Sequence, residues 1–436
     1  MSEPLLVGLI LVIGMFGLMA IGVSVSVSIG LPSAICAVIL MGSERGLYTA
    51  AQKIYNGIDS FPLLAIPFFV LAGTIMNQGG IAGRLIDLAR ALTGKMPGAL
   101  AQTNVIANAM FGSISGSALA GASAVGAVMA PAQRRDRYDM NFAAATNVAS
   151  APSGMLIPPS NVLIVYGLVS QVSVGALFLA GYIPGILWMF TCMLMVWLYA
   201  RRRPELRGSH WPKPKEALVA LWRATPSLGL VIVVIGGIVF GFFTPTEGAA
   251  IAVVYAVALS LVYRTITLHD FPKILLDATR TSSVVIFLIA LSSIMSYVMT
   301  YSRIPRLIGE WMVSVTDSKV VFLLIMMAIL LIIGIPLDAT PAILIFTPIF
   351  LPIATQYFGI HPVHLGIMMV FNMCLAVISP PSAPVLFVGA RVAGKKVEDV
   401  IMPLLPFFVA LMVTLLIVQF VPELSLWLPR QFGLIR

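Results

Sequence analysis

Residues 157–167 read IPPSNVLIVYG and residues 379–389 read SPPSAPVLFVG, so one Pro-Pro-Ser phrase occurs twice, at positions 158 and 380. Each copy interrupts a long apolar stretch. A proline removes a helical hydrogen bond, and the interior of a bilayer has no water to replace that bond. The two phrases therefore predict two broken helices at matching places in two halves of the chain. This pattern is typical of the binding site of a secondary transporter.

The composition indicates an all-α polytopic membrane protein. Of the 436 residues, 59% are hydrophobic and 10% are charged, whereas a soluble domain carries about 25% charged residues. The basic residues behind the net charge of +9 lie in short loops between apolar segments. They favour contact with membrane lipids and give no reason to expect a nucleic-acid partner. The three cysteines are isolated in apolar segments, so neither a disulfide nor a transition-metal site is expected.

Twelve hydrophobic segments are predicted, eight continuous and four interrupted. The continuous spans lie near residues 4–22, 26–42, 61–77, 176–200, 227–243, 249–263, 282–301 and 400–422. Segments 99–133 and 318–357 are predicted to be re-entrant hairpins, with two ordinary spans each as the alternative. Segments 141–170 and 364–390 are predicted to be the broken helices, with kinks used only for packing as the alternative.

The basic residues predict the orientation of the chain. If the loops alternate between two sides, 19 of the 26 lysine and arginine residues fall on one side, which should be cytoplasmic. Both termini then lie in the periplasm, and the two halves run in opposite senses. We expect a first inverted repeat over 1–200, a cytoplasmic linker with an amphipathic surface helix over 201–226, and a second inverted repeat over 227–436. Segments 79–96 and 265–281 are predicted as further surface helices, or plain loops.

Hydroxyl groups and glycines at the first hairpin tip suggest a site for a coupling cation. Sodium is a hard cation that takes oxygen ligands, and unwound backbone can supply carbonyl oxygens. The tip reads GSISGS at 112–117, and it is predicted to face the first break. The candidate ligands of this first site are Ser113, Ser115, Gly116, Ser117, Ser150, Pro158 and Ser160.

The second hairpin tip adds a carboxylate. Asp338 is the only one of the 17 acidic residues that lies deep within a hydrophobic segment, and such a carboxylate is usually functional. The alternative is an N-cap that bonds backbone N–H groups of the tip, and both roles are compatible. The candidate ligands of this second site are Gly334, Asp338, Thr340, Ser379, Pro380 and Ser382.

The half-helices that follow the breaks begin with groups that attract anions. Ser160 and Ser382 are predicted to cap them, and helix N-termini carry partial positive charge. The candidate substrate-binding residues are Ser117, Asn147, Ser160, Asn372 and Ser382. For Asn147, Ser150 and Asn372 the alternative is hydrogen bonding between helices. The four histidines are expected in loops, so no proton relay is predicted.

Several of these motifs, in this order, resemble the large membrane subunit of tripartite ATP-independent periplasmic (TRAP) transporters. They are GSISGS, MLIPPS, GFFTPTEGAA (241–250), LDATPAILIFTPIFLPI (337–353) and SPPS. The resemblance covers nearly the whole chain. It implies an elevator-type carrier of the bacterial inner membrane that uses sodium ions to take up an organic acid. It also implies two partners, a periplasmic substrate-binding protein and a small four-span membrane subunit.

Two other functions remain as alternatives. One is a stand-alone sodium/carboxylate carrier of the same superfamily. The other is a membrane-embedded enzyme, which would need a nucleophile–base pair or a metal cluster at membrane depth. The sequence shows one acid and no His or Cys cluster at that depth, so we do not expect an enzyme.

Overall fold

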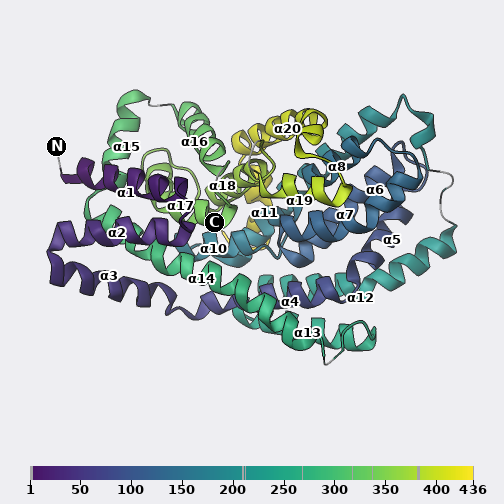
Figure 1. Cartoon of the computed structure of the whole chain (residues 1–436), viewed down its shortest axis with the longest axis horizontal. Helices are drawn as coiled ribbons and strands as arrows, with labels where there is room; N and C mark the ends of the chain where they lie inside the picture. Colours follow the sequence, from purple (N-terminus) through teal and green to yellow (C-terminus); the bar gives the residue numbers. More distant parts are fainter. Residues whose placement is uncertain are drawn as a thin grey trace.

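The computed structural model describes residues 3–435 apart from 209–210, 212, 268, 317, 336 and 381–382, and its regular elements in this part of the chain are all helices (Figure 1). Seven of the described helices are long and apolar enough to cross a membrane, or eight if the bent pair around the first Pro-Pro-Ser is one span. The prediction of an all-α polytopic membrane protein is confirmed.

Among the described residues, the first half of the chain contains eleven α-helices. They are α1 (Glu3–Ala20), α2 (Val25–Met41), α3 (Ser43–Ile58), α4 (Ala65–Gln78), α5 (Ile81–Thr93), α6 (Ala99–Ser115), α7 (Ala118–Arg135), α8 (Met140–Ser150), α9 (Ser153–Leu156), α10 (Asn161–Ser170) and α11 (Val174–Ala200). Two short 3₁₀ turns, η1 (Phe61–Leu64) and η2 (Pro204–Leu206), precede α4 and follow α11.

The second half continues with ten α-helices among the described residues. They are α12 (Pro214–Val239), α13 (Pro245–Val262), α14 (Phe271–Tyr301), α15 (Ile304–Val315), α16 (Lys319–Gly334), α17 (Ala339–Gln356), α18 (Pro362–Ala376), α19 (Pro384–Ala393), α20 (Val397–Phe420) and α21 (Glu423–Gln431).

The two segments predicted to be hairpins each form a pair of helices, α6–α7 and α16–α17. Gly116 ends α6 with a left-handed backbone (φ 61°) that favours glycine. Ser117 then caps α7 by accepting a hydrogen bond from the Ala120 N–H. At the second tip Asp338 caps α17 by accepting from the Ala339 N–H at 2.9 Å. Short polar side chains thus begin the return helix of each hairpin, as N-caps require.

Both predicted breaks are also present. The helix pair on either side of the first Pro-Pro-Ser bends by 41°, and Ser160 caps α10 by accepting from the Leu163 N–H, as predicted. In the second half, α18 stops at Ala376 and α19 starts at Pro384. Ser382, the predicted second cap, lies outside the described residues.

A close approach between helices repeats at an offset of 222 positions. A Cβ atom added at Gly112 of α6 would lie 2.3 Å from the Gly154 Cα of α9, and one added at Gly334 of α16 would lie 2.4 Å from the Ala376 Cβ of α18. Positions 112 and 334, and positions 154 and 376, are each 222 apart. In both halves a glycine therefore lets the first hairpin helix touch the helix that leads into the break.

The hairpins and the broken helices interlock across the two halves. Helix α7 packs against α19, and α17 packs against α10. The Arg134 guanidinium donates to the Ala393 carbonyl at 2.9 Å, and the Tyr166 hydroxyl donates to the Pro362 carbonyl at 2.6 Å. We call the helices α6–α11 and α16–α21 the hairpin body, because these contacts tie them together.

The remaining long helices form a second group, which we call the frame (α1–α4 and α12–α14). Helix α14 packs against α2, α3 and α4, and α13 packs against α4 and α12. Figure 1 shows α3, α4, α12 and α13 along one edge of the molecule, with α18, α19 and α20 toward the other. The amphipathic helices α5 and α15 lie toward opposite ends of the long axis (Figure 1). Each packs on a helix of the hairpin that follows it, α5 on α6 and α15 on α17.

Several helix boundaries differ from the predictions. The amphipathic part of the linker over 201–226 continues into the next span as one helix, α12, and the surface helix at 265–281 is the start of α14. Helices α3, α15 and α21 were not predicted, because a search for apolar runs does not detect amphipathic helices. The prediction that all histidines lie in loops is wrong, since His364 is buried in α18.

Candidate functional site

A cavity of about 300 Å³ lies where the two hairpin tips and the two breaks meet. The first tip supplies Ser115 to Ala120, and the first break supplies Met155, Asn161, Val162 and Val165; the second tip supplies Asp338 to Thr340, and the second break Val377, Pro384 and Val385. Helices α4 and α14 of the frame close the opposite wall. The sequence predicted the tips and breaks to face one another in two pairs, and all four meet at this cavity.

The cavity is surrounded by helix ends. The last carbonyls of a helix and its first N–H groups lack partners within the helix. Helix α6 ends at this cavity, and α7, α10, α17 and α19 begin there. Carbonyls at the C-terminus favour a cation, and the N-termini favour an anion, because the helix dipole points from one to the other. The arrangement can hold opposite charges side by side.

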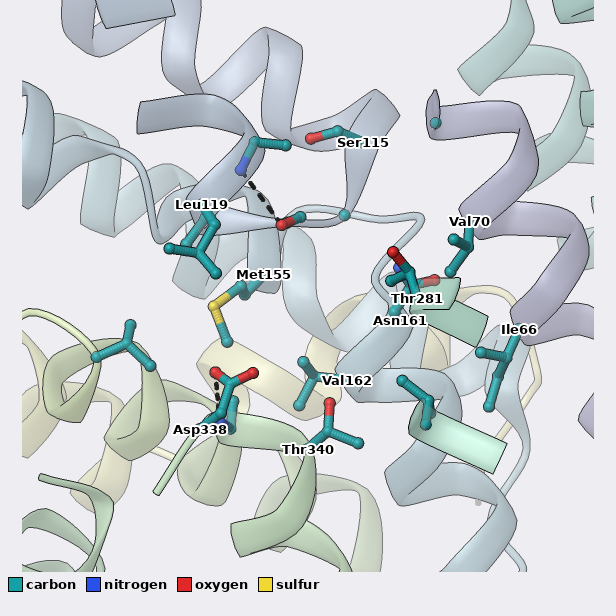
Figure 2. Close-up of a pocket in the computed structure, with 18 of the residues that line it drawn as sticks. Ile66, Val70, Ser115, Leu119, Met155, Asn161, Val162, Thr281, Asp338 and Thr340 are labelled. Atoms are coloured by element: carbon teal, nitrogen blue, oxygen red, sulfur yellow. Dashed lines mark hydrogen bonds between the residues drawn. The ribbon is translucent and has the colours of Figure 1, made fainter. Parts of the chain in front are cut away.

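Asp338 brings the carboxylate of the second tip into this cavity. One of its oxygens accepts the Ala339 N–H, as noted for the cap, and the side chain is exposed because it faces the open space. Figure 2 shows Asp338 and Thr340 on one side of the cavity and Ser115 on the opposite side, with Met155 between them. The cap and the cavity position occur together, so the two interpretations of Asp338 do not compete.

The serines of the first tip differ in how they are bonded. Ser115 is buried with an unpartnered hydroxyl and lines the cavity. Ser113 donates to the Met110 carbonyl at 2.7 Å and does not line it. Ser117 lines the cavity while capping α7. The Ser115 hydroxyl therefore has no hydrogen-bond partner, whereas the Ser113 and Ser117 hydroxyls are bonded to backbone groups.

The first tip lies directly against the first break. A Cβ atom added at Gly116 would lie 3.0 Å from the Pro159 carbonyl oxygen and 3.3 Å from the Asn161 N–H nitrogen. Pro158 belongs to this same stretch. Ser160 is buried, and its hydroxyl donates to the Met155 carbonyl at 2.5 Å. The Pro159 carbonyl of the break is thus within reach of the tip, and backbone carbonyl groups of this kind can bind a cation.

Only some of the residues predicted for the second site line the cavity. Thr340 lines the cavity. Gly334 forms the close contact with Ala376 described above. Ser379 donates to the Leu375 carbonyl at 2.8 Å, Pro380 is half-buried, and neither lines the cavity. Ser382 lies outside the described residues.

Asn147 and Ser150 belong to a buried polar cluster and do not line the cavity. The Asn108 amide donates to the Asn147 Oδ1 at 3.0 Å and to the Ser150 hydroxyl at 2.8 Å. It also donates to the Asn104 Oδ1 at 2.9 Å. Asn372 donates to the Met368 carbonyl at 3.0 Å within α18. Hydrogen bonding within and between helices, the alternative named for these residues, accounts for Asn147 and Ser150.

Four polar residues of the cavity were not predicted from the sequence. Asn161 directly follows the Ser160 cap, so its position beside the break was a signal. Thr74 and Asn77 of α4 and Thr281 of α14 also line the cavity. They lie in other parts of the chain, and only the packing of the frame against the hairpin body brings them there.

Comparison with known proteins places the fold and the family. The family model of the tripartite ATP-independent periplasmic transporter, DctM component, matches residues 12–424. The chain is 39% identical to the C4-dicarboxylate TRAP transporter large permease protein DctM of Pseudomonas aeruginosa, over 93% of this chain and 95% of the relative. It is 35% identical to the sialic acid TRAP transporter large permease protein SiaM of Vibrio cholerae, over 97% and 98%.

A solved structure supports the fold independently. The YdaH transporter of Alcanivorax borkumensis, whose crystal structure is described as having an unusual topology, superposes with a TM-score of 0.64 over 100% of both chains at 15% sequence identity. This likeness concerns the fold alone. The family match and the two relatives carry the family assignment, and the motifs of the two tips and the two breaks agree with it. The chain therefore belongs to the family of the DctM component of tripartite ATP-independent periplasmic transporters.

Proposed function

We propose that this chain is the permease of a sodium-coupled importer of an organic acid in the bacterial inner membrane. The observation that carries the proposal is the single cavity at which both hairpin tips and both helix breaks meet. It joins the unpartnered Ser115 hydroxyl, a carboxylate and several helix N-termini in one place. Two kinds of cargo, a cation and an anion, can thus bind as neighbours.

The positions of the tips support re-entrant hairpins and an inverted repeat. Two full spans per hairpin would also return to their starting side, so the basic residues alone do not decide between these alternatives. The amphipathic helices that lead into the hairpins lie toward opposite ends of the molecule (Figure 1), yet both tips line one cavity. Hairpins that enter from opposite faces and stop midway account for both facts.

The oxygen atoms at the tips suit sodium. Ser115, the carbonyl groups at the end of α6 and the backbone of the first break would form one site. Asp338 and Thr340 would form part of the other. Since only the second site has a carboxylate, we expect the two sites to differ in affinity. No transition-metal ion and no other cofactor enters this mechanism.

The substrate class follows from the helix N-termini and from the relatives. Helices α7, α10, α17 and α19 begin at the cavity, and their N–H groups favour a carboxylate. Relatives are named for C4-dicarboxylates and sialic acid, both of which are organic acids. Ser117 and Asn161 would contact the acid, and a periplasmic binding protein would deliver it. A small four-span subunit would extend the frame.

Movement of the hairpin body against the frame would carry the cavity across the membrane. The contacts of α4 with α6 and α10, and of α14 with α17, are the surface on which such an elevator would slide. The crossed packing within the hairpin body favours its motion as one unit. This division into a moving and a fixed part matches the two groups of helices.

The substitution Asp338→Asn tests the sodium site. We expect uptake into proteoliposomes that contain the complete complex to lose most of its dependence on a sodium gradient. Asp399→Asn is the matched control, because Asp399 is an exposed acid in the first turn of α20 and lies away from the cavity. Full uptake with unchanged sodium dependence in Asp338→Asn would refute the assignment. Uptake without the binding protein would instead favour a stand-alone carrier.

A further inference from the structure

A second cavity, of about 420 Å³, lies farther along the interface between the hairpin body and the frame. Its polar lining consists of Asn56, Ser60, Gln171, Ser292, Ser293 and Ser296. The described lining carries no charged side chain. Amide and hydroxyl groups can bond a carboxylate or hydroxyl group of a substrate without holding it as tightly as a fixed charge would.

The same helices line both cavities in the same order. On α14, Thr281 and Val285 line the first cavity and Ser292, Ser293 and Ser296 line the second. Thr281 and Ser292 are 11 residues apart, which is about three helical turns or roughly 16 Å along the axis. They therefore occupy nearly the same face of α14. Helices α10 and α17 also present their first residues to the first cavity and later residues to the second.

An apolar layer separates the two cavities. It consists of Ile66 (0% exposed), Val165 (1%), Ile289 (7%) and Leu344 (3%). Along α14 of the frame, the apolar Val285 and Ile289 thus lie between the polar Thr281 and Ser292. Polar groups on both sides of an apolar barrier are what a path for a polar solute needs, because the barrier prevents leakage.

The polar groups of the second cavity are not explained by packing alone. Ser292 is 4% exposed, and its hydroxyl oxygen is buried without a hydrogen-bond partner. A buried hydroxyl group without a partner has lost its hydrogen bonds to water and is therefore unfavourable. By contrast, Ser293 donates to the Ile289 carbonyl at 2.9 Å. Ser292 therefore retains a hydrogen-bonding capacity that the fold leaves unused.

We propose that the second cavity is a second substrate station on the frame. In the state shown, the tips face Thr74, Asn77 and Thr281. After the hairpin body has moved about three turns along α14, the tips would face the serines of α14. The organic acid would then exchange contacts with Thr281 for contacts with Ser292 and Ser296. This inference rests on the proposed function.

Cysteine pairs test whether the hairpin body reaches the second station. In a complex whose Cys36, Cys192 and Cys374 are replaced by alanine, Val162→Cys is combined with Val285→Cys or with Ser296→Cys. We expect the first pair to cross-link with Hg²⁺ in the state shown. We expect the second pair to cross-link during turnover and to block uptake until the mercury is removed by thiol. Cross-linking of the first pair without any of the second under turnover would overturn the inference.

Serine substitutions give an independent readout. We expect Ser292→Ala to raise the substrate KM severalfold while the sodium dependence of uptake stays unchanged. Thr300→Ala is the matched control, since Thr300 is an exposed hydroxyl on α14 that bonds the Ser296 carbonyl within its own helix. An unchanged KM in Ser292→Ala would refute the station. Uptake by the wild-type complex that does not depend on sodium would instead refute the proposed function. The two failures are therefore distinguishable.

Discussion

Ser113 and Ser115 are two positions apart, but substitution of their hydroxyl groups is expected to have opposite effects. Ser115 has a buried, unpartnered hydroxyl at the cavity, and Ser113 is bonded to Met110. We expect Ser115→Ala to raise the sodium concentration for half-maximal uptake about tenfold, which is roughly 1.4 kcal/mol of binding free energy. Its thermal stability should not fall, because no protein hydrogen bond is lost.

Ser113→Ala is the control for this experiment. It removes a hydrogen bond within α6, so we expect a stability loss of about 1 kcal/mol and an unchanged response to sodium. Both variants are measured by sodium titration of uptake and by thermal unfolding in detergent. A Ser115→Ala protein that is destabilised but keeps its sodium response would show that the hydroxyl is structural.

Local chemistry made some residues predictable. The role of Ser160 as a cap follows from short-range hydrogen bonding, and the structure shows it. The cavity position of Asp338 follows from the cost of a carboxylate in an apolar segment. The cluster around Asn108 could not be located in the same way, because Asn147 and Ser150 come from another helix.

At the scale of elements, the contact between α6 and α9 depends on the absence of a side chain at Gly112. An added Cβ would lie 2.3 Å from a backbone atom of Gly154, and backbone cannot move aside as a flexible side chain can. We expect Gly112→Ala to destabilise the protein by about 1–3 kcal/mol and to abolish uptake by displacing the first tip. Thermal unfolding and uptake assays measure the two effects.

Gly236→Ala is the control for the effect of replacing a helical glycine with alanine. Gly236 lies within α12 and an added Cβ would meet nothing within 4 Å. Because glycine inside a helix is less favourable than alanine by about 0.5–1 kcal/mol, this variant should be as stable as the wild type or more so. If Gly112→Ala behaves like Gly236→Ala, the close contact is not a constraint.

The equivalent contact in the second half allows an exchange experiment. Gly334→Ala would place its Cβ 2.4 Å from the Ala376 Cβ, so we expect a loss of stability and of uptake. Adding Ala376→Gly removes the opposing atom and should restore most of both. Ala376→Gly alone is the remaining corner of the double-mutant cycle, and a coupling energy near zero would exclude a direct contact.

The long apolar helices and the two interruptions in each half were predictable, because they follow from hydropathy and from proline chemistry. The amphipathic helix α3 was not, since its polar residues hide it from a search for apolar runs. The merging of the linker helix into α12 was also missed. Pro226 lies inside α12, and the helix continues through it, although a proline favours a helix boundary.

For the whole molecule, the crossed packing of α7 on α19 and of α17 on α10 is the feature that the sequence could not supply. The repeated phrase predicts two related halves, but it gives no information on how the halves pack against each other. The same holds for the frame, whose Thr74, Asn77 and Thr281 reach the cavity only through tertiary contacts. The tips and breaks, which supply most of the cavity wall, were therefore predictable.

The opposite orientation proposed for the two hairpins leads to a prediction about the membrane. Arg135 ends α7 and Gln356 ends α17, and both are exposed. If the hairpins enter from opposite faces, Arg135→Cys should react with a membrane-impermeant maleimide only in inside-out vesicles. Gln356→Cys should react only in right-side-out vesicles, because the side that holds most basic residues is expected to be cytoplasmic.

Two controls make the labelling experiment decisive. The protein without its three cysteines should remain unlabelled, and a membrane-permeant maleimide should label both single-cysteine variants in either kind of vesicle. Labelling of both positions from one face would contradict the inverted arrangement, and it would leave the meeting of the two tips at one cavity without an explanation. Labelling from opposite faces requires each hairpin to stop midway, since only then do tips that start on different sides reach the same cavity.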